Sequence, residues 1–218
     1  MHHLKDADIS LAKSIQHTSL SDLVEIMPGY PFRGAVQAND QGEHWALLPG
    51  VFQALGVAMS PETSLLTRVK LTGRREPDLL KEGDIIFLAK GTRNTAGFVH
   101  QSPDNIVCSP HFFHLRIKAE QQSKVLPQFI AWQLNSSNSQ KFFKTIAQGS
   151  ASGSIAITKQ ELGGLPILLP SFEQQVTFCK LYSAQLQQQA IYQKLIHNSQ
   201  QLIAAVGNQL INDTNLNR

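Results

Sequence analysis

Hydrophobic and polar positions change their pattern twice along this chain. Up to about residue 126, short runs rich in β-branched and aromatic residues alternate with turn signals, as in residues 84–89 and 111–117. Such runs, bounded by glycine, proline, asparagine and aspartate, are typical of strands. The turn signals are Pro28-Gly29-Tyr30-Pro31, Asp40-Gln41-Gly42, Glu82-Gly83-Asp84 and Ser102-Pro103-Asp104-Asn105. This part of the chain is therefore predicted to be a mixed, strand-rich fold.

From about residue 127 to 162 the spacing becomes helical. Apolar residues group around residues 129–134 and again around 142–146, with a polar break between them, and Gly149 is expected to end the second helix. Thr158-Lys159-Gln160-Glu161 has the form of a capping box before two glycines, which predicts a single helical turn. The proline-bracketed run 165–170 predicts a short extended segment.

A long C-terminal helix is predicted from Ser171, whose side chain and that of Gln174 have the spacing of a second capping box. No proline interrupts the chain from there to about Ile211, and a helix of about forty residues would span roughly 60 Å. Its opposite face is rich in glutamine. The alternatives are an intermolecular coiled coil or bundle, and a helical hairpin broken near residues 197–199 that packs on itself.

Heptad-like spacing marks the apolar stripe of this helix. Its predicted partner-contacting residues are Tyr182, Leu186, Leu195, Ile196, Leu202, Ile203, Val206 and Leu210.

The predicted fold class is thus α+β, with a strand-rich mixed domain followed by a long α-helix. The expected division is 1–170 for the domain, 171–212 for the helix and 213–218 for a disordered tail.

Composition limits the classes of protein to which this chain can belong. The chain has 218 residues, 42% of them hydrophobic and 16% charged, which is enough to bury a core. No apolar run approaches the ~20 residues of a membrane helix, and residues 1–5 lack the apolar core of a signal peptide. We therefore expect a cytoplasmic protein without membrane association, whose two cysteines, Cys108 and Cys179, are reduced.

Signatures of catalysis are weak. His111 and His114 lie three apart in a strand-like run, so they would face opposite sides and not share a metal. Lys90-Gly91-Thr92 lacks the glycine spacing of a phosphate loop.

A restriction-type nuclease would need a Pro-Asp pair followed by an acidic residue and a lysine two apart. Pro77-Asp78 and Pro103-Asp104 supply the first half, but Arg116-Ile117-Lys118 has arginine where the carboxylate belongs. The sequence therefore indicates no catalytic residues, metal site or cofactor on this chain.

Basic residues are concentrated between Arg68 and Arg93, where seven cations against four carboxylates give +3, equal to the excess of the whole chain. Arginine suits bidentate contact with guanine or phosphate, and Arg93-Asn94 would set a guanine reader beside an adenine reader. A basic loop that is merely solvated is the alternative.

Several ordered motifs resemble one family, the DNA specificity subunits of type I restriction-modification systems. They are residues 26–34, 80–87 continuing to 92, 147–151, 157–162 and 165–175, and the resemblance that their order and spacing support covers about residues 19 to 210. The resemblance covers one target recognition domain and one long helix, whereas the family normally carries two of each, so the chain is expected to be a half-length form.

This resemblance implies a non-catalytic, sequence-specific DNA-binding subunit that directs a methyltransferase, and in restriction complexes a nuclease-translocase, to its site in phage defence. S-adenosylmethionine would be bound by the methyltransferase partner. A homodimer through antiparallel C-terminal helices would place two domains on an inverted-repeat site.

The DNA-contacting residues expected from the resemblance and the basic window divide by role. Lys90, Thr92 and Lys159 would hold phosphates, and Arg93, Asn94 and Gln148 would meet base edges. For Gln148 the alternative is helix termination, and the same alternative holds for Ser150. The complete set is Arg33, Arg74, Arg75, Lys90, Thr92, Arg93, Asn94, Gln148, Ser150 and Lys159.

The leading hypothesis is thus a DNA specificity subunit. The second is a protein-binding adaptor of a defence complex that has the fold without base reading, and the third is the nuclease.

Overall fold

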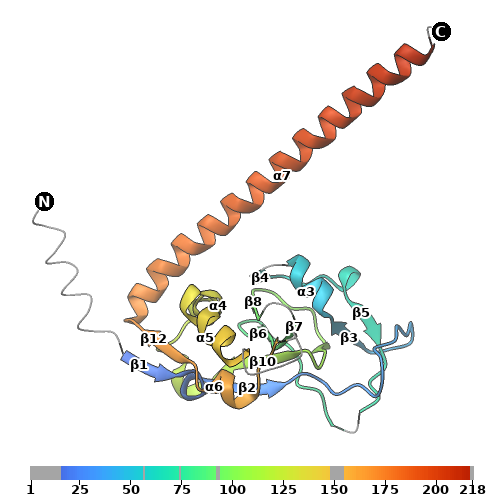
Figure 1. Cartoon of the computed structure of the whole chain (residues 1–218). Coiled ribbons are helices and arrows are strands. Elements are labelled where there is room, and N and C mark those ends of the chain that lie inside the picture. Colours follow the sequence, from blue (N-terminus) through green and yellow to red (C-terminus); the bar gives the residue numbers. More distant parts are fainter. Residues whose placement is uncertain (1–15, 56, 74, 92–93, 148–154, 217–218) are drawn as a thin grey trace, which may run out of the picture. The chain divides into compact units, whose positions relative to one another are not determined.

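A computed structural model describes residues 16–216 except 56, 74, 92–93 and 148–154 (Figure 1). The chain divides into two compact units, one through Gln175 and one from Val176 onward. The first is an α+β domain and the second is helical, which confirms the predicted fold class.

A five-stranded sheet with strand order β2-β10-β6-β8-β4 forms the centre of the first unit. Its strands are β2 (Val24–Pro28), β4 (Ala58–Met59), β6 (Ile85–Leu88), β8 (Ala96–Val99) and β10 (Phe112–Ile117). The two runs predicted as strands thus become β6 and β10, which pair antiparallel.

Three smaller sheets are present among the described residues of the domain. They are β5-β3-β9, β1-β12 and β11-β7. Their strands are β1 (Gln16–Ser19), β3 (His44–Leu47), β5 (Thr67–Val69), β7 (Lys90–Gly91), β9 (Ile106–Cys108), β11 (Ile155–Ala156) and β12 (Pro166–Leu169). The proline-bracketed run is therefore the strand β12, as predicted.

Helices lie on both sides of the central sheet (Figure 1). Those of the first unit are α2 (Leu20–Leu23), α3 (Pro49–Leu55), α4 (Pro127–Asn135), α5 (Ser137–Ala147) and α6 (Lys159–Gly163), with single 3-10 turns at Thr63–Leu65 and Ala119–Gln121. The predicted pair of helices after residue 127 and the single turn after Thr158 are both present. Thr158 and Glu161 form the predicted capping box.

The alternation of β6 explains why the core has two layers. Ile85 and Phe87 point to the side covered by α2, α4, α5 and α6. Ile86 and Leu88 point to the side covered by α3, β3 and β9. All four are buried, because successive side chains of a strand face opposite sides and both faces of this sheet are covered.

The long helix α7 (Phe172–Leu216) begins after Ser171, where the predicted capping box with Gln174 is present. Its first turn belongs to the first unit, since the buried Gln175 amide bonds to the backbone of Lys124, Leu126 and Pro170. α7 continues through residues 197–199 without a break and past the predicted end at residue 212. The chain therefore does not form the helical hairpin that was the alternative.

Candidate nucleic-acid interface

A buried carboxylate, Asp84, organises part of the predicted basic window between Arg68 and Arg93. Leu115 of β10 pairs with Ile85 of β6, so the antiparallel register places Arg116 opposite Asp84. Arg116 donates to Asp84 from Nε at 2.8 Å and from Nη2 at 2.7 Å. The Nε2 atom of His114, two residues before Arg116 on the same face of β10, lies 2.6 Å from Asp84 Oδ2.

Burial by itself would raise the pKa of Asp84, which is 2% exposed. The hydrogen bonds from His114 and Arg116 outweigh burial and hold that pKa below its ordinary value. Because an ionised carboxylate only accepts hydrogen bonds, His114 Nε2 must carry the shared proton. Asp84 is thus a charged, fully engaged structural group.

The same group fixes the backbone from Leu79 to Asp84. Lys81 N donates to Asp84 Oδ2 at 2.7 Å, and Arg116 Nη2 donates to the Leu79 carbonyl at 3.1 Å. Gly83 allows the tight turn because its φ of +84° is a conformation that other residues rarely adopt. The turn predicted at residues 82–84 is therefore anchored by the side chain that ends it.

These contacts bear directly on the nuclease hypothesis. Asp84 is bonded to Arg116 and His114, and Asp78 is bonded to Arg75. Within the described part of the chain, no group of three or more His, Cys, Asp or Glu side chains is placed to hold a metal ion. Carboxylates engaged by cations in this way are not arranged as a metal site.

Two loops of the domain bring candidate DNA-contacting residues together. We call residues 29–34 the Tyr30 loop, and the described residues 70–73 and 75–78 the Arg75 loop. The Gly73 amide donates to the Tyr30 hydroxyl at 2.7 Å. The Arg33 amide donates to Thr72 Oγ1 at 3.1 Å. Two residues about forty positions apart in sequence, Arg33 and Arg75, therefore lie on paired loops, and both are exposed.

The Tyr30 loop is itself fixed to the sheet. Gly29 N donates to the Phe112 carbonyl and Tyr30 N to the Cys108 carbonyl, at 3.0 and 2.8 Å. A Cβ atom at Gly29 would lie 2.0 Å from the Ser109 carbonyl oxygen, so only glycine fits there. The Pro28-Gly29-Tyr30 motif thus has a steric reason in this fold.

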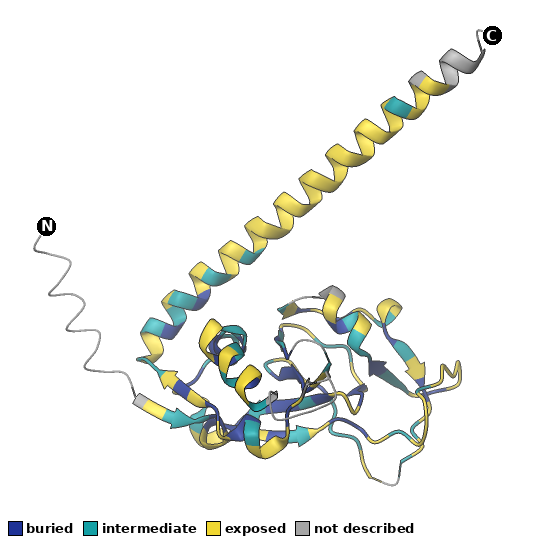
Figure 2. Cartoon of the chain, in the orientation of Figure 1, coloured by how far each residue is buried: buried dark blue, intermediate teal, exposed yellow. Residues whose placement is uncertain are grey.

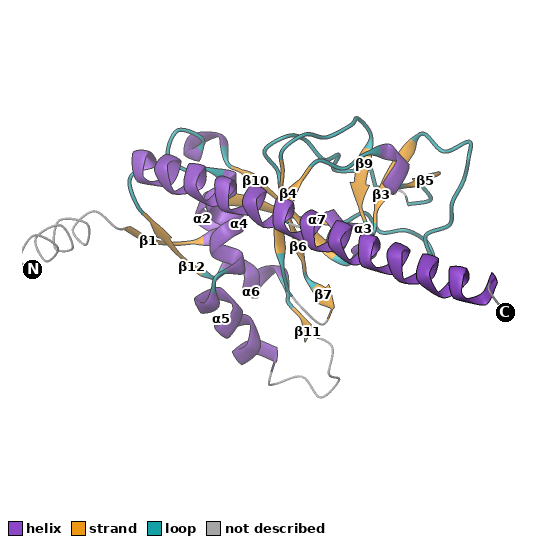
Figure 3. Cartoon of the chain, turned by 90° about the horizontal axis from the view of Figure 1, so that it is seen from above, coloured by secondary structure: helices purple, strands orange, loops and turns teal. Residues whose placement is uncertain are grey.

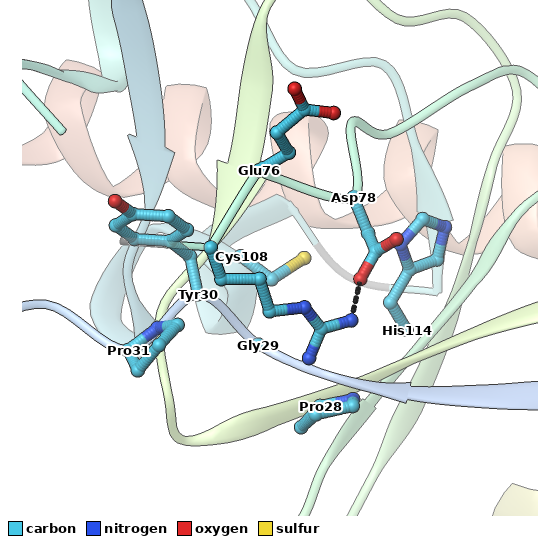
Figure 4. Close-up of a pocket in the computed structure, with 9 residues that line it drawn as sticks. Pro28, Gly29, Tyr30, Pro31, Glu76, Asp78, Cys108 and His114 are labelled. Carbon is cyan, nitrogen blue, oxygen red and sulfur yellow. Dashed lines mark hydrogen bonds and ion pairs between the residues drawn. The ribbon is translucent and has the colours of Figure 1, made fainter. Parts of the chain in front are cut away.

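A small cavity of about 10 Å³ borders both loops (Figure 4). It is lined by Pro28, Gly29, Tyr30, Pro31, Arg75, Glu76, Asp78, Cys108 and His114. Arg75 Nη2 bonds to Asp78 Oδ2 at 2.5 Å, which uses one of the five N–H donors of the guanidinium. The side chain of Arg75 remains 49% exposed, so it stays available to a ligand.

Lys90 and Lys159 come close in the fold through the β7–β11 ladder. Lys90 pairs with Ala156, Ile157 N donates to the Ala89 carbonyl at 2.9 Å, and α6 begins at Lys159. Both lysines are exposed. The structure therefore places the two predicted phosphate contacts on adjoining elements.

Asn94 corrects the sequence prediction. It is 2% exposed, and its Nδ2 donates to the carbonyls of Leu88 and Ala89, both at 3.1 Å. Both N–H donors of the amide thus have partners inside the domain. Asn94 holds the loop after β6 and is not placed to read adenine.

Five of the predicted DNA-contacting residues are not described by the structure. Arg74, Thr92, Arg93, Gln148 and Ser150 lie outside the described residues. For these residues the sequence prediction stands as it was.

Two exposed lysines were missed by the sequence reading. Lys141 and Lys144 lie on the outer face of α5, whose inner face buries Phe143 and which contacts β11 (Figure 3). Their spacing of three residues on an amphipathic helix was the available signal. They bring more positive charge to the region of the domain that carries β11 and Lys90.

The second unit, α7 from Val176 onward, is exposed over most of its length (Figure 2), and large apolar side chains are among its exposed residues. Leu195 is 58% exposed, Leu202 63% and Ile203 71%. Ile196 and Val206 are exposed as well, Tyr182 and Leu186 are half-buried, and the side chain of Leu210 lies outside the description. In the part of the chain that the structure describes, every helix falls short of the length or the hydrophobicity that a membrane-spanning segment needs.

Comparison with known proteins gives a likeness of fold. The sequence matches no family model and no curated protein. A chain from a structure on complex assembly and conformational transition of the type I restriction-modification system matches with TM-score 0.54 and 15% identity, over 81% of this chain and 39% of that one.

Two further solved structures have a similar fold. The HsdS subunit from Thermoanaerobacter tengcongensis matches with TM-score 0.51 and 16% identity, over 85% of this chain and 44% of the subunit. The type I S subunit from M. genitalium matches with TM-score 0.54 and 13% identity, over 85% and 42%. The chain spans about two fifths of these chains and has the fold of type I specificity subunits, as the resemblance in sequence implied.

Proposed function

We propose that this chain is a non-catalytic DNA specificity subunit that directs a type I-like methyltransferase to its target. The observation that carries the proposal is the fold shared with S subunits of type I restriction-modification systems. The charged residues agree with it, since Arg33 and Arg75 lie on paired loops and Lys90 lies near Lys159. In this proposal the methyltransferase partner binds S-adenosylmethionine, and a restriction subunit joins in restriction complexes.

The proposed partner of α7 is a second copy of this chain. Its apolar stripe is exposed, and a helix of this kind becomes stable by burying that stripe against another helix. Two copies related by twofold symmetry would present two identical recognition domains.

The exposed stripe also favours the second candidate, an adaptor that binds proteins through α7 and reads no bases. Charge reversal separates the two candidates. Binding of fluorescein-labelled duplex DNA by fluorescence anisotropy would fall in Arg33→Glu and Lys90→Glu variants of a specificity subunit, and an adaptor would show no DNA affinity to lose. Salt-insensitive or absent DNA binding, with tight binding to a methyltransferase, would establish the adaptor instead.

A further inference from the structure

Tyr30 has its ring in an apolar cluster and its hydroxyl group bonded to a loop. Its ring belongs to a small apolar cluster with Ala46, Val69 and Val107, and it meets Phe32 edge-on at 4.9 Å. Its hydroxyl, at the other end, accepts the Gly73 amide at 2.7 Å. The residue therefore connects a packed interior to the backbone of the Arg75 loop.

Gly73 is fitted closely to this arrangement. A Cβ atom there would lie 2.7 Å from the Tyr30 hydroxyl oxygen and 3.2 Å from the Pro31 carbonyl oxygen. The first distance is shorter than real Cβ contacts allow, and a ring held in a core cannot swing away at low cost. A side chain at residue 73 and the Tyr30 hydroxyl therefore compete for the same space.

This bond fixes the first half of the Arg75 loop, and the segment directly after the loop is fixed independently. Arg116 holds the Leu79 carbonyl and Asp84 holds the Lys81 amide. Between these anchors the Arg75 guanidinium is exposed and oriented by Asp78. The orientation of Arg75 thus depends on both ends of its loop, and the Tyr30 hydroxyl, together with the bond from the Arg33 amide to Thr72, holds one of them.

We propose that Tyr30 is a positioning residue for DNA binding, whose hydroxyl holds the Arg75 loop so that Arg75, and Arg33 beside it, meet phosphates together. This inference rests on the proposed function. Ordering the loop in the free protein lowers the entropy lost on binding, so that contacts made from it contribute more to affinity. Tyr30 itself is buried, so in this proposal it acts on DNA binding through the loop and not by touching DNA.

The test uses the full chain, a mixed-sequence 30-base-pair duplex and a salt series from 50 to 200 mM. Tyr30→Phe keeps the ring and removes the acceptor. We expect its affinity to fall by about 3- to 10-fold at low salt, with the slope of log K against log salt smaller by up to about 1, the effect of one lost phosphate contact. Tyr192→Phe, which removes an exposed hydroxyl that accepts from Gln188, is the matched control and is expected to bind as the wild type does.

A double-variant comparison distinguishes positioning from direct contact. Gly73→Ala alone is expected to lower affinity, because its Cβ collides with the Tyr30 hydroxyl. In the Gly73→Ala background, removing that hydroxyl relieves the shortest contact, so Tyr30→Phe should cause no further loss. A hydroxyl that touched DNA directly would instead give the same loss in both backgrounds.

Folding is checked by thermal unfolding, and the loop itself by hydrogen exchange at the Gly73 amide, which should be faster in Tyr30→Phe. If the wild type binds DNA and Tyr30→Phe has the same affinity and salt slope, this inference is wrong and the proposed function still stands. If Tyr30→Phe does not fold, equal DNA binding by Gly73→Ala and wild type overturns it. No duplex binding by the wild type at 50 mM salt overturns the proposed function, and the inference with it.

Discussion

At the residue scale, the domain depends on a few polar side chains that are buried and fully bonded. Asp84 is the clearest case, because Arg116, His114 and the Lys81 amide all donate to it. None of these residues was singled out as a group from the sequence. Each is ordinary alone, and only the β6–β10 register brings them together.

Replacing Asp84 with asparagine would remove the negative charge and leave Arg116 without its counter-ion. Breaking a buried pair costs about 3–5 kcal/mol, and Arg116 is one third exposed, so we expect a loss of about 2–4 kcal/mol. Urea unfolding measures this free energy. Asp104→Asn, at an exposed turn, is the matched control and should change it by less than about 0.5 kcal/mol.

The pH dependence of this difference has a definite sign. Because the folded pKa of Asp84 lies below its unfolded value, its contribution is fully present above about pH 4 and is lost as pH falls through the folded pKa. The gap in stability between wild type and Asp84→Asn should therefore narrow below pH 4. A gap that stays constant down to pH 2 would contradict the assignment of a charged Asp84.

At the element scale, glutamine and asparagine side chains of α4 fasten the helix to neighbouring strands. Gln133 Nε2 donates to the Leu168 carbonyl at 2.7 Å, and its Oε1 accepts the Leu168 amide at 3.0 Å. Asn135 bonds to the amide and carbonyl of Ala96 in the same two-point way. Each amide thus satisfies one N–H and one C=O of a strand residue, as a neighbouring strand would.

Replacing Gln133 with methionine keeps the volume and removes both bonds to β12. Leaving a buried N–H and C=O without partners predicts a loss of about 1–3 kcal/mol in the free energy of unfolding. Hydrogen exchange would show faster exchange at the Leu168 amide. Gln128→Met, on the same helix and half-buried, is the control, and equal effects of the two variants would refute the bridging role.

The other element with a testable surface is α7. If its stripe pairs with a second copy, Leu202→Glu places two buried charges in the interface, and we expect the dimer dissociation constant to rise by at least about 100-fold. Analytical ultracentrifugation measures it. Gln200→Glu adds the same charge outside the predicted stripe. The same oligomeric state for both variants would argue against the coiled-coil dimer.

At the scale of the whole molecule, the proposal predicts how DNA binding responds to salt and to symmetry. Of the cations predicted to contact DNA, the structure describes four per copy, Arg33, Arg75, Lys90 and Lys159, which makes eight in a pair. For 6–10 phosphate contacts, affinity should fall by about 10³- to 10⁵-fold between 50 and 200 mM salt. Anisotropy titrations measure this, and a flat salt response would exclude phosphate contacts as the source of binding.

Symmetry gives a second prediction at this scale. A twofold pair of recognition domains binds an inverted repeat better than a direct repeat of the same half-site. Selection from a random duplex library would therefore enrich palindromic sequences. Enrichment of single half-sites without symmetry would favour a domain that acts alone.

What the sequence determined follows from local physics. The strand runs at 84–89 and 111–117, the capping boxes at Thr158 and Ser171, and the long helix were all predictable, because alternation, caps and heptad spacing act between near neighbours. Tertiary structure decided the rest. Burial excludes Asn94 as a DNA contact, whereas Lys90 is exposed. The register between β6 and β10 brings Asp84 and Arg116 together. The pairing of Tyr30 with Gly73 joins positions about forty residues apart, a distance over which no local pattern in one sequence specifies a contact.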